Sequence, residues 1–290
     1  MDRAWSGVFP AVTTKFKEDD SLDHGAMEQH FNAEIEAGVH GLVVIGSLGE
    51  NGVLSAEEKQ EVLRTAVSVS DRRVPVLACV AETTTAAACR FVEKAGVTGA
   101  DGFMLLPAMQ YVADPRETMH HLRSVAAASD RPLMIYNNPV AYRVDVTPEM
   151  FAELANEAKF VAIKESSEDI RRVTDIINLV GDRYQIFCGV DNLALEALLL
   201  GAVGWLAGLV NAFPRETVVL YELARAGRWA EALTLYRWFM PLLHLDVSTK
   251  LVQNIKLAEA MTGLGTEYVR APRLPLAGEE RKHGCRPVSL

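Results

Sequence analysis

The sequence predicts an α/β protein: a (β/α)8 TIM barrel with a C-terminal helical extension. Two observations carry this prediction. Eight short apolar runs recur over residues 8–206, and helix-like amphipathic stretches separate them. After residue 226 the alternation stops and only helical patterns follow. Strands that alternate with helices form parallel sheets with right-handed crossovers, and eight such units close a barrel.

The apolar runs are the predicted strands, because a strand buried on both faces reads as a continuous apolar segment. They are Val8–Thr13, Gly41–Ile45, Val74–Val80, Gly102–Leu106, Leu133–Tyr136, Phe160–Lys164, Gln185–Gly189 and Gly204–Leu206. The expected helices between them are Asp23–Ala37, Ser55–Ser70, Thr83–Ala95, Pro115–Ser129, Thr147–Ala158, Ser167–Val180 and Asn192–Leu200. Ser55 with Glu58 three residues later, and Thr147 before a proline, are typical helix starts.

We expect the barrel to span residues 1–225 and the helical extension residues 226–290. In the extension, Trp229–Val252 and Lys256–Met261 are predicted helices, and three late prolines predict an irregular tail with a loose terminus. Trp229 and its aromatic neighbours are expected in the core or at a subunit interface. A doubly wound open sheet is the structural alternative, but it usually has fewer strands and a glycine-rich phosphate loop, which the sequence lacks.

Composition narrows the possible partners. The chain has 290 residues, a net charge of -9 and no clustered basic stripe, so we expect no nucleic-acid partner. No stretch approaches the length of an apolar membrane span, so we expect no membrane partner. Four cysteines without CxxC spacing favour a reducing compartment, and the N-terminus lacks a signal-peptide pattern, which together predict a cytoplasmic protein.

The ends of the predicted strands carry the residues of chemical interest, since they face the active-site mouth of a barrel. Lys164 ends the sixth strand and Tyr136 ends the fifth. Poor solvation lowers the pKa of a lysine and frees its amine as a nucleophile, as a Schiff-base enzyme requires. After the second strand, Gly46–Glu50 offers backbone amides that could hold a carboxylate.

Each of these features also has an ordinary structural explanation. A single strand-end lysine is more often a surface residue, a tyrosine in an apolar run is usually a core residue, and a glycine loop is often only a turn. His244 and Asp246 in the extension form a weak candidate pair of metal ligands. The strand-end residues together, in barrel order, are much harder to explain as packing alone.

Five segments resemble the motifs of one family. Gly46–Glu50 looks like its Gly-[Ser/Thr]-Thr-Gly-Glu loop, Tyr136–Pro139 like its Tyr-Asn-x-Pro motif, and Ile163–Glu165 like its Schiff-base lysine segment. Gly201–Asn211 is similar to its eighth-strand segment, and Ile255–Leu276 to its C-terminal helix and Arg-x-Pro-x turn. On these motifs the chain resembles the dihydrodipicolinate synthase and N-acetylneuraminate lyase family of Schiff-base barrel enzymes.

This resemblance implies the roles of the site residues. Lys164 would form the imine, and Tyr136, helped by Ser47, would move protons. The implied substrate-binding residues are Ser47, Leu48, Gly189, Leu206 and Asn138. The family pattern implies no metal and no organic cofactor besides the covalent Schiff base on the lysine. It also implies a homotetramer that binds a small carboxylate substrate.

Three departures from the family pattern concern the substrate. Leu48 stands where the family loop has a hydroxyl. Ala141 stands where dihydrodipicolinate synthases have an arginine for the second carboxylate, with Arg143 two residues later. Met109 stands where these synthases borrow a tyrosine from a neighbouring subunit, and Tyr111 is the nearest phenol. A second carboxylate without its bidentate partner binds poorly, which disfavours dihydrodipicolinate synthesis.

The loops around Ser47 and Tyr136 look like those of the hydroxyproline-degrading branch, the 1-pyrroline-4-hydroxy-2-carboxylate deaminases. The implied activity is a Schiff-base deamination that yields 2-oxoglutarate semialdehyde and ammonia from a substrate with one carboxylate. Three alternatives stay open. They are a class I pyruvate-dependent aldolase or lyase or 2-keto-3-deoxy sugar acid dehydratase, a dihydrodipicolinate synthase, and a non-catalytic barrel that senses a keto acid. The presence of Lys164, Tyr136 and Ser47 argues against the last.

Overall fold

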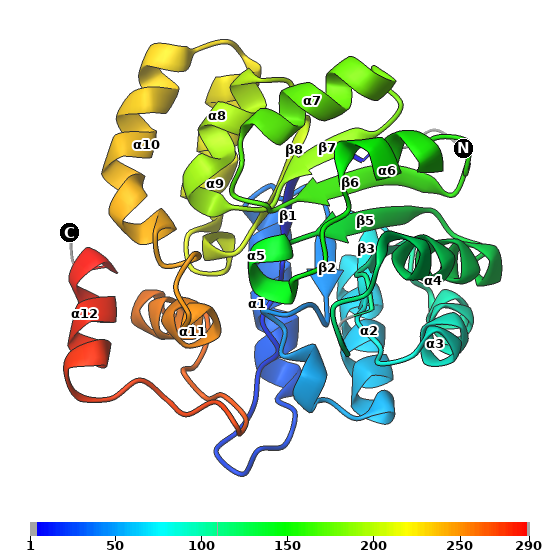
Figure 1. The fold of residues 1–290 in the computed structure, drawn as a ribbon. Helices are drawn as coiled ribbons and strands as arrows, with labels where there is room; N and C mark the ends of the chain where they lie inside the picture. Colours follow the sequence, from blue (N-terminus) through cyan, green and yellow to red (C-terminus); the bar gives the residue numbers. More distant parts are fainter. Residues whose placement is uncertain (1–4, 109, 289–290) are drawn as a thin grey trace.

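Eight parallel strands surround the core of the protein (Figure 1). The computed structural model describes residues 5–108 and 110–288. The strands are β1 (Gly7–Pro10), β2 (Leu42–Val44), β3 (Val76–Val80), β4 (Gly102–Leu105), β5 (Leu133–Asn137), β6 (Phe160–Glu165), β7 (Gln185–Cys188) and β8 (Gly204–Ala207). They pair in the order β1-β8-β7-β6-β5-β4-β3-β2. Beyond β1, a parallel bridge between Ala11 and Val43 joins its end to β2, so the predicted (β/α)8 barrel is confirmed.

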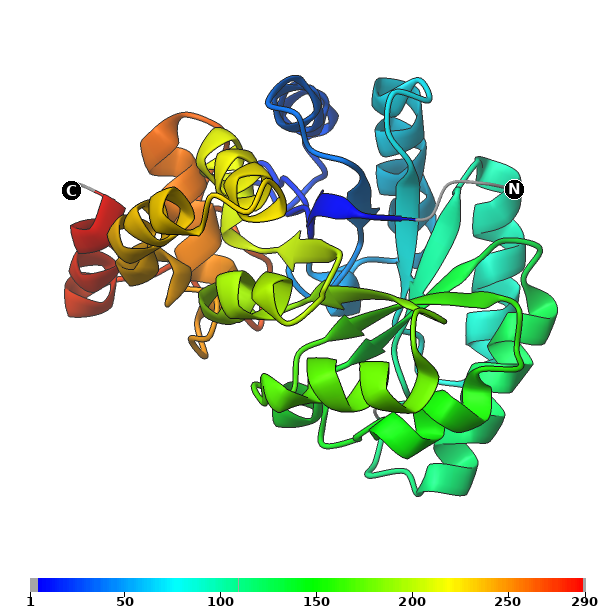
Figure 2. The same ribbon diagram turned by 90° about the horizontal axis from the view of Figure 1, so that it is seen from above.

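Helices follow the strands and cover the outside of the barrel (Figures 1 and 2). They are α1 (His24–Glu36), η1 (Asn51–Val53), α2 (Ala56–Ser70), α3 (Thr85–Thr98), α4 (Pro115–Ala128), α5 (Pro139–Tyr142), α6 (Pro148–Leu154), α7 (Arg171–Val180), η2 (Asp191–Leu193), α8 (Ala194–Leu199), η3 (Leu209–Asn211) and α9 (Pro214–Arg225). The helix starts follow from the sequence: Ser55 and Glu58 form a capping box, and the Thr147 side chain accepts a hydrogen bond from the Met150 amide.

Aromatic side chains fill part of the barrel interior, and glycines make room for them. Phe9 and Phe187 pack edge-on with ring centroids 5.1 Å apart. A Cβ atom at Gly41 would lie 2.2 Å from the Phe9 ring, and one at Gly204 would lie 2.3 Å from the Phe187 ring. Close packing of this kind leaves no space for added atoms, so glycine is required both at Gly41, just before β2, and at Gly204 in β8.

Three helices follow the barrel and gather on one side of it, where the orange and red segments lie in Figure 2. They are α10 (Trp229–Leu243), α11 (Leu251–Thr262) and α12 (Gly278–Val288). Within α10, Tyr236 and Phe239 are buried as expected, whereas Trp229 and Trp238 are partly exposed. Among the described helices, none combines the length and hydropathy that crossing a bilayer requires.

One prediction for the extension is wrong, and a second is only partly right, since residues 264–277 are irregular as expected but a helix follows them. The helix predicted over Trp229–Val252 is interrupted, because α10 ends at Leu243 and residues 244–250 form a loop. Pro241 in the last turn of α10 lacks an amide donor, and helices tend to end near such a residue. The predicted irregular tail contains α12, whose first turn carries Glu279 and Glu280, acids that favour a helix N-terminus.

Candidate active site

A cavity of about 300 Å³ opens at the carboxyl ends of the strands. It is the part of a barrel where loops of different strands meet. All the residues that the sequence predicted for the site line this cavity: Ser47, Leu48, Tyr136, Asn138, Lys164, Gly189 and Leu206. Residues of the loop between α10 and α11 line it as well, although the sequence indicated no such contribution.

Lys164 lies on β6 directly opposite Tyr136 on β5. Its Nζ atom is 3.9 Å from the centre of the Tyr136 ring, and the residue is only 7% exposed. Burial lowers the pKa of Lys164, although neighbouring groups such as Tyr142 and Asp246 raise it. A larger share of the amine is therefore neutral at a given pH, which is the form that attacks a carbonyl or imine carbon.

Gly189 leaves the space that the lysine side chain needs. A Cβ atom at this position would lie 2.4 Å from Lys164 Cε and 2.1 Å from Ser166 Oγ. The Ser166 hydroxyl is buried and has no hydrogen-bond partner among the described residues. Because the glycine after β7 packs on both side chains, it determines how Lys164 and Ser166 enter the cavity.

The Tyr136 phenol is held beside the lysine by a side-chain contact. Asn138 Nδ2 donates a hydrogen bond to Tyr136 Oη at 3.1 Å. Burial raises the pKa of Tyr136 to about 12, and the interactions with Asn138 and Tyr142 oppose that rise. The phenol is therefore protonated near neutral pH and can deliver a proton to an atom that forms next to Lys164.

Tyr142 is a site residue that the sequence analysis did not single out. Its hydroxyl forms a short hydrogen bond with Ser47 Oγ, and its ring packs edge-on against Tyr136 with centroids 5.7 Å apart. Burial raises the pKa of Tyr142 above its ordinary value. The short helix α5 carries this phenol back to the site, so Ser47, Tyr142 and Tyr136 form a compact hydroxyl cluster from one chain.

The residues considered as substitutes for the missing family groups lie elsewhere. Arg143 and Tyr111 are exposed, and neither lines the cavity. Met109 lies outside the described residues. The only signal for Tyr142 was its place at the end of the segment Tyr136–Arg143, where spacing alone does not show which side chain turns inward.

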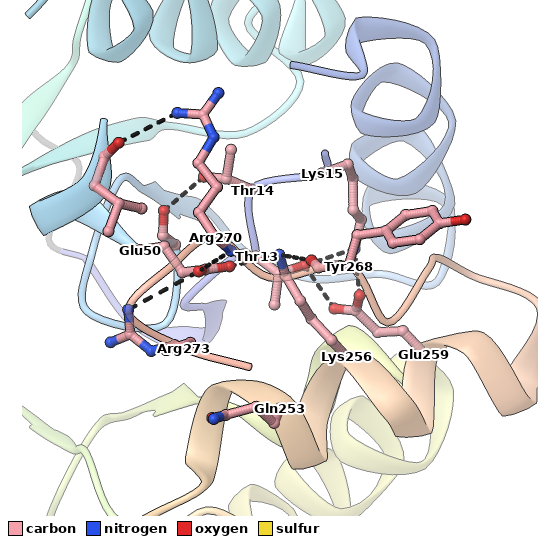
Figure 3. Close-up of polar contacts among 12 residues, drawn as sticks. Thr13, Thr14, Lys15, Glu50, Gln253, Lys256, Glu259, Tyr268, Arg270 and Arg273 are labelled. Carbon is pink, nitrogen blue, oxygen red and sulfur yellow. Dashed lines mark hydrogen bonds and ion pairs between the residues drawn. The ribbon is translucent and has the colours of Figure 1, made fainter. Parts of the chain in front are cut away.

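Glu50, at the end of the loop that carries Ser47, is held by α11 and the segment after it (Figure 3). Glu50 ends this loop in a left-handed conformation with φ 58°. Its buried carboxylate accepts hydrogen bonds from Lys256 Nζ at 2.6 Å and from the Arg270 amide at 3.2 Å. Lys256 Nζ also donates to the Tyr268 carbonyl at 2.6 Å. Thus α11 and the segment after it determine the position of a loop of the barrel.

Two further carboxyl groups lie near the lysine. Asp191 accepts hydrogen bonds from Trp205 Nε1 at 2.8 Å and from the Leu209 amide at 2.7 Å. Asp246, from the loop between α10 and α11, accepts one from the Asp191 amide at 3.1 Å and lines the cavity. Burial and the nearby Asp191 raise the pKa of Asp246 well above its ordinary value.

The sequence indicated Asp246 only as a weak candidate metal ligand together with His244. Among the described residues, no group of three or more His, Cys, Asp or Glu side chains could hold a metal ion. His244 instead makes a 2.9 Å contact between its Nδ1 atom and the side-chain Nδ2 atom of Asn192. The two residues therefore act separately, and only Asp246 reaches the cavity.

Comparison with known proteins identifies the family of the chain. The model of the dihydrodipicolinate synthetase family matches residues 4–288. The chain belongs to this family. A 4-hydroxy-tetrahydrodipicolinate synthase of Methanothrix thermoacetophila is 33% identical over 94% of this chain and 92% of its own length. A protein of the same name from Phocaeicola vulgatus is 32% identical, covering 93% of this chain and 91% of its own.

Solved structures of the family have the same fold. A putative dihydrodipicolinate synthetase of Pseudomonas aeruginosa superposes with a TM-score of 0.94 at 29% identity, over 98% of this chain and 99% of that one. An E. coli prophage protein of the family, solved in complex with pyruvate, gives a TM-score of 0.93 at 27% identity over 99% and 98% of the two chains. The protein is thus an enzyme of the synthase and lyase family, in which a Schiff-base lysine is typical.

Proposed function

We propose that this enzyme forms a Schiff base with a substrate that has one carboxylate, and that it deaminates 1-pyrroline-4-hydroxy-2-carboxylate to 2-oxoglutarate semialdehyde and ammonia. One observation carries the proposal. Lys164 is the only basic side chain among the described residues that line the cavity, whereas Glu168 and Asp246 line it with carboxyl groups. A second substrate carboxylate would lose its hydration without gaining a positively charged partner, and this desolvation costs binding free energy.

The chain's residues suit the first half of this reaction. The Lys164 amine adds to C2 of the cyclic imine, and the ring C2–N bond breaks to leave a primary amine on C5. The enzyme imine at C2 then acidifies a C3 proton. Ser47, Tyr136 and Tyr142 form the hydroxyl cluster that can accept and return protons here. The substrate carboxylate would bind at Ser47 and the amides near Leu48.

The remaining steps balance without a redox partner. The C4 hydroxyl leaves as water, and the C5 enamine becomes an imine after protonation at C4. One water hydrolyses that imine and releases ammonia, and a second water releases the keto acid from Lys164. Counting the water lost at C4, one substrate and one net water give one 2-oxoglutarate semialdehyde and one ammonia.

A second candidate is 4-hydroxy-tetrahydrodipicolinate synthase, because relatives with that name match this chain over more than nine-tenths of its length. In that case Lys164 would hold pyruvate and the cavity would admit an aldehyde that carries its own carboxylate. Ala141 supplies no cation for it, and the guanidinium of the exposed Arg143 lies outside the cavity. A pyruvate-releasing lyase or a sugar-acid dehydratase would use the same lysine and is distinguished by its products.

The deciding experiment combines borohydride trapping with an ammonia assay. The enzyme is mixed with the hydroxypyrroline carboxylate or with pyruvate and then reduced with borohydride. The mass of the intact protein is measured by mass spectrometry. We expect a covalent adduct on Lys164 with the pyrroline, together with stoichiometric ammonia. A pyruvate adduct, condensation with aspartate semialdehyde and no turnover of the pyrroline would instead establish the synthase.

The variant Lys164→Ala tests the nucleophile directly. It should abolish trapping and turnover, because no other lysine lines the cavity among the described residues. Lys159→Ala is the matched control, since Lys159 is exposed immediately before the same strand. Turnover by Lys164→Ala at near wild-type rate would reject the Schiff-base mechanism.

We also propose a cytoplasmic homotetramer in which residues 1–225 form the barrel and residues 226–290 the extension. Free Cys79 and Cys188 are consistent with a reducing compartment. The partly exposed Trp229 and Trp238 are candidates for a subunit contact. Light scattering on the purified enzyme tests the tetramer, and a monomeric mass would reject it.

A further inference from the structure

Asp246 enters the cavity on a different side from the residues that the sequence predicted for the substrate carboxylate. Ser47 and Leu48 follow β2, whereas Asp246 lies beside residues that follow β7 and β8. In the strand order, β2 is separated from β7 and β8 by β1 on one side of the barrel. A substrate whose carboxylate occupies the β2 side and whose C2 meets Lys164 can therefore extend its distal carbons toward Asp246.

The two oxygens of Asp246 are in different environments. Oδ2 accepts the hydrogen bond from the Asp191 amide at 3.1 Å. Oδ1 lies against Gly208, where an added Cβ atom would come within 2.4 Å of it. Within the described part of the chain, Oδ1 has no hydrogen-bond partner. One oxygen therefore fixes the side chain, and the other is available to a molecule in the cavity.

The other acids near the lysine are less suited to reacting with a substrate. Asp191 is fully buried, and its oxygens accept hydrogen bonds from Trp205, Gly208 and Leu209. Glu168 lines the cavity but is exposed. Asp246 is the acid that combines partial burial, a fixed position and a free oxygen.

We propose that Asp246 is the catalytic acid for the C4 hydroxyl of the substrate. This role rests on the proposed deamination. The electron pair of the C2–C3 enamine forms the C3=C4 double bond, the C4–O bond breaks, and the Asp246 proton leaves with the hydroxyl as water. The resulting carboxylate then removes a proton from C5, which the conjugated imine acidifies, and so returns to its acid form.

The electrostatic surroundings favour a protonated Asp246 before the step. Burial and repulsion from Asp191 and Glu168 raise its pKa, while Lys164 opposes the rise. Tyr136 also faces it from β5 and is neutral, since its own pKa is raised to about 12. Once Lys164 is bound in a neutral enamine, its opposing charge is gone, and the acid form of Asp246 is favoured further.

The test is the variant Asp246→Asn, which keeps the shape and the acceptor for the Asp191 amide but cannot donate the proton of an acid. With the hydroxypyrroline carboxylate, borohydride should still trap an adduct on Lys164. We expect the adduct to retain the C4 hydroxyl, whereas ammonia release falls about 100-fold, a typical loss for a general acid. Asp175→Asn, an exposed carboxylate on α7, is the matched control and should release ammonia at the wild-type rate.

A second variant guards against a merely structural effect. Asp246→Ala should lose ammonia release to a similar extent and regain part of it when formate is added, since a small acid can occupy the vacated space. In the wild type, ammonia release should fall as pH rises through the raised pKa of Asp246, and this limb should disappear in Asp246→Asn.

The outcomes separate this role from the proposed function. Wild-type ammonia release by Asp246→Asn would overturn the role of Asp246 and leave the deaminase intact. Loss of the trapped adduct together with turnover would also overturn it, because the residue would then act on Lys164 and not on C4. A wild-type enzyme that neither forms a pyrroline adduct nor releases ammonia would reject the deaminase and this role with it.

Discussion

At the scale of single residues, the proposed role of the hydroxyl cluster of Ser47, Tyr136 and Tyr142 in proton transfer can be tested. Tyr142→Phe removes the hydroxyl that bonds Ser47 but leaves the ring that packs on Tyr136. We expect kcat to fall about 100-fold with little change in KM, because general acid–base groups contribute on this scale. Steady-state kinetics with the substrate that borohydride traps on the wild-type enzyme measure the effect.

Arg143→Ala is the matched control for that variant, since it changes the next residue, whose side chain is exposed. It should leave both kinetic constants unchanged. Equal rates for Tyr142→Phe and wild type would show that Ser47 works without this partner. A large fall in kcat for Arg143→Ala, with none for Tyr142→Phe, would assign the catalytic role to Arg143 and not to Tyr142.

Gly189→Ala tests how tightly the lysine is positioned. The added methyl group would overlap Lys164 Cε and Ser166 Oγ, so the two side chains must move. Overpacking in such sites costs about 1–3 kcal/mol of stability. We expect a folded enzyme by circular dichroism whose borohydride adduct forms much more slowly. An adduct that forms at the wild-type rate would contradict the tight placement of Lys164 by this glycine.

The sequence predicted the site residues on strand ends because their place in the fold follows from the strand pattern. Lys164 and Tyr136 end neighbouring strands, and the register pairs them directly. Tyr142 and Asp246 were not predicted as proton-transfer residues, since their positions depend on packing: Tyr142 contacts Ser47 and Tyr136, and Asp246 lines the cavity. Asp246 is bound by the amide of Asp191, 55 residues away in the chain, and no local pattern encodes that contact.

At the scale of elements, α11 supports the loop that carries Ser47 through a buried ion pair. Lys256 and Glu50 both have fully buried side chains and lie 2.6 Å apart (Figure 3). Lys256→Met leaves the Glu50 carboxylate without this partner, which should lower the free energy of unfolding by about 3–5 kcal/mol. Urea denaturation measures the loss, and activity should fall as the loop shifts.

Two controls accompany this variant. The double variant Glu50→Gln with Lys256→Met removes both charges and should recover much of the lost stability, because no uncompensated charge remains. Lys282→Met breaks the exposed pair with Glu279 and should cost less than about 1 kcal/mol. A loss for Lys256→Met no larger than for Lys282→Met would show that the buried pair does not stabilise the fold.

The same region shows where prediction of elements fails. The sequence predicted one helix over Trp229–Val252 and a second over Lys256–Met261, whereas the structure has α10, a loop over residues 244–250, and α11 from Leu251 to Thr262. Besides Pro241 near the end of α10, the contact of Asp246 with the Asp191 amide favours the loop, and local helix propensity does not include such a contact. The strands were predicted more closely, since burial on both faces leaves a clear apolar run.

At the scale of the whole molecule, Lys164, the proposed nucleophile, should lower the stability of the fold. Lys164 is buried, and burial lowers its pKa below the ordinary 10.5, so the unfolded chain binds the proton more tightly than the folded one. Lys164→Met fills similar space without a charge. We expect this variant to raise the free energy of unfolding by about 1 kcal/mol, a common gain when a functional residue that destabilises the fold is replaced. The variant should also lose activity.

The pH dependence of that gain distinguishes its cause. Below the lowered pKa of Lys164 the amine is charged in both states, so the full cost of burying the charge is present. As pH rises from that pKa toward 10.5, only the unfolded chain keeps the proton, and wild-type stability rises relative to the variant. Urea denaturation should therefore show a gap between Lys164→Met and wild type that is widest near about pH 7 and shrinks toward about pH 10. A gap that stays constant over this range would mean that the methionine stabilises by packing, and that the buried charge of Lys164 costs the fold nothing.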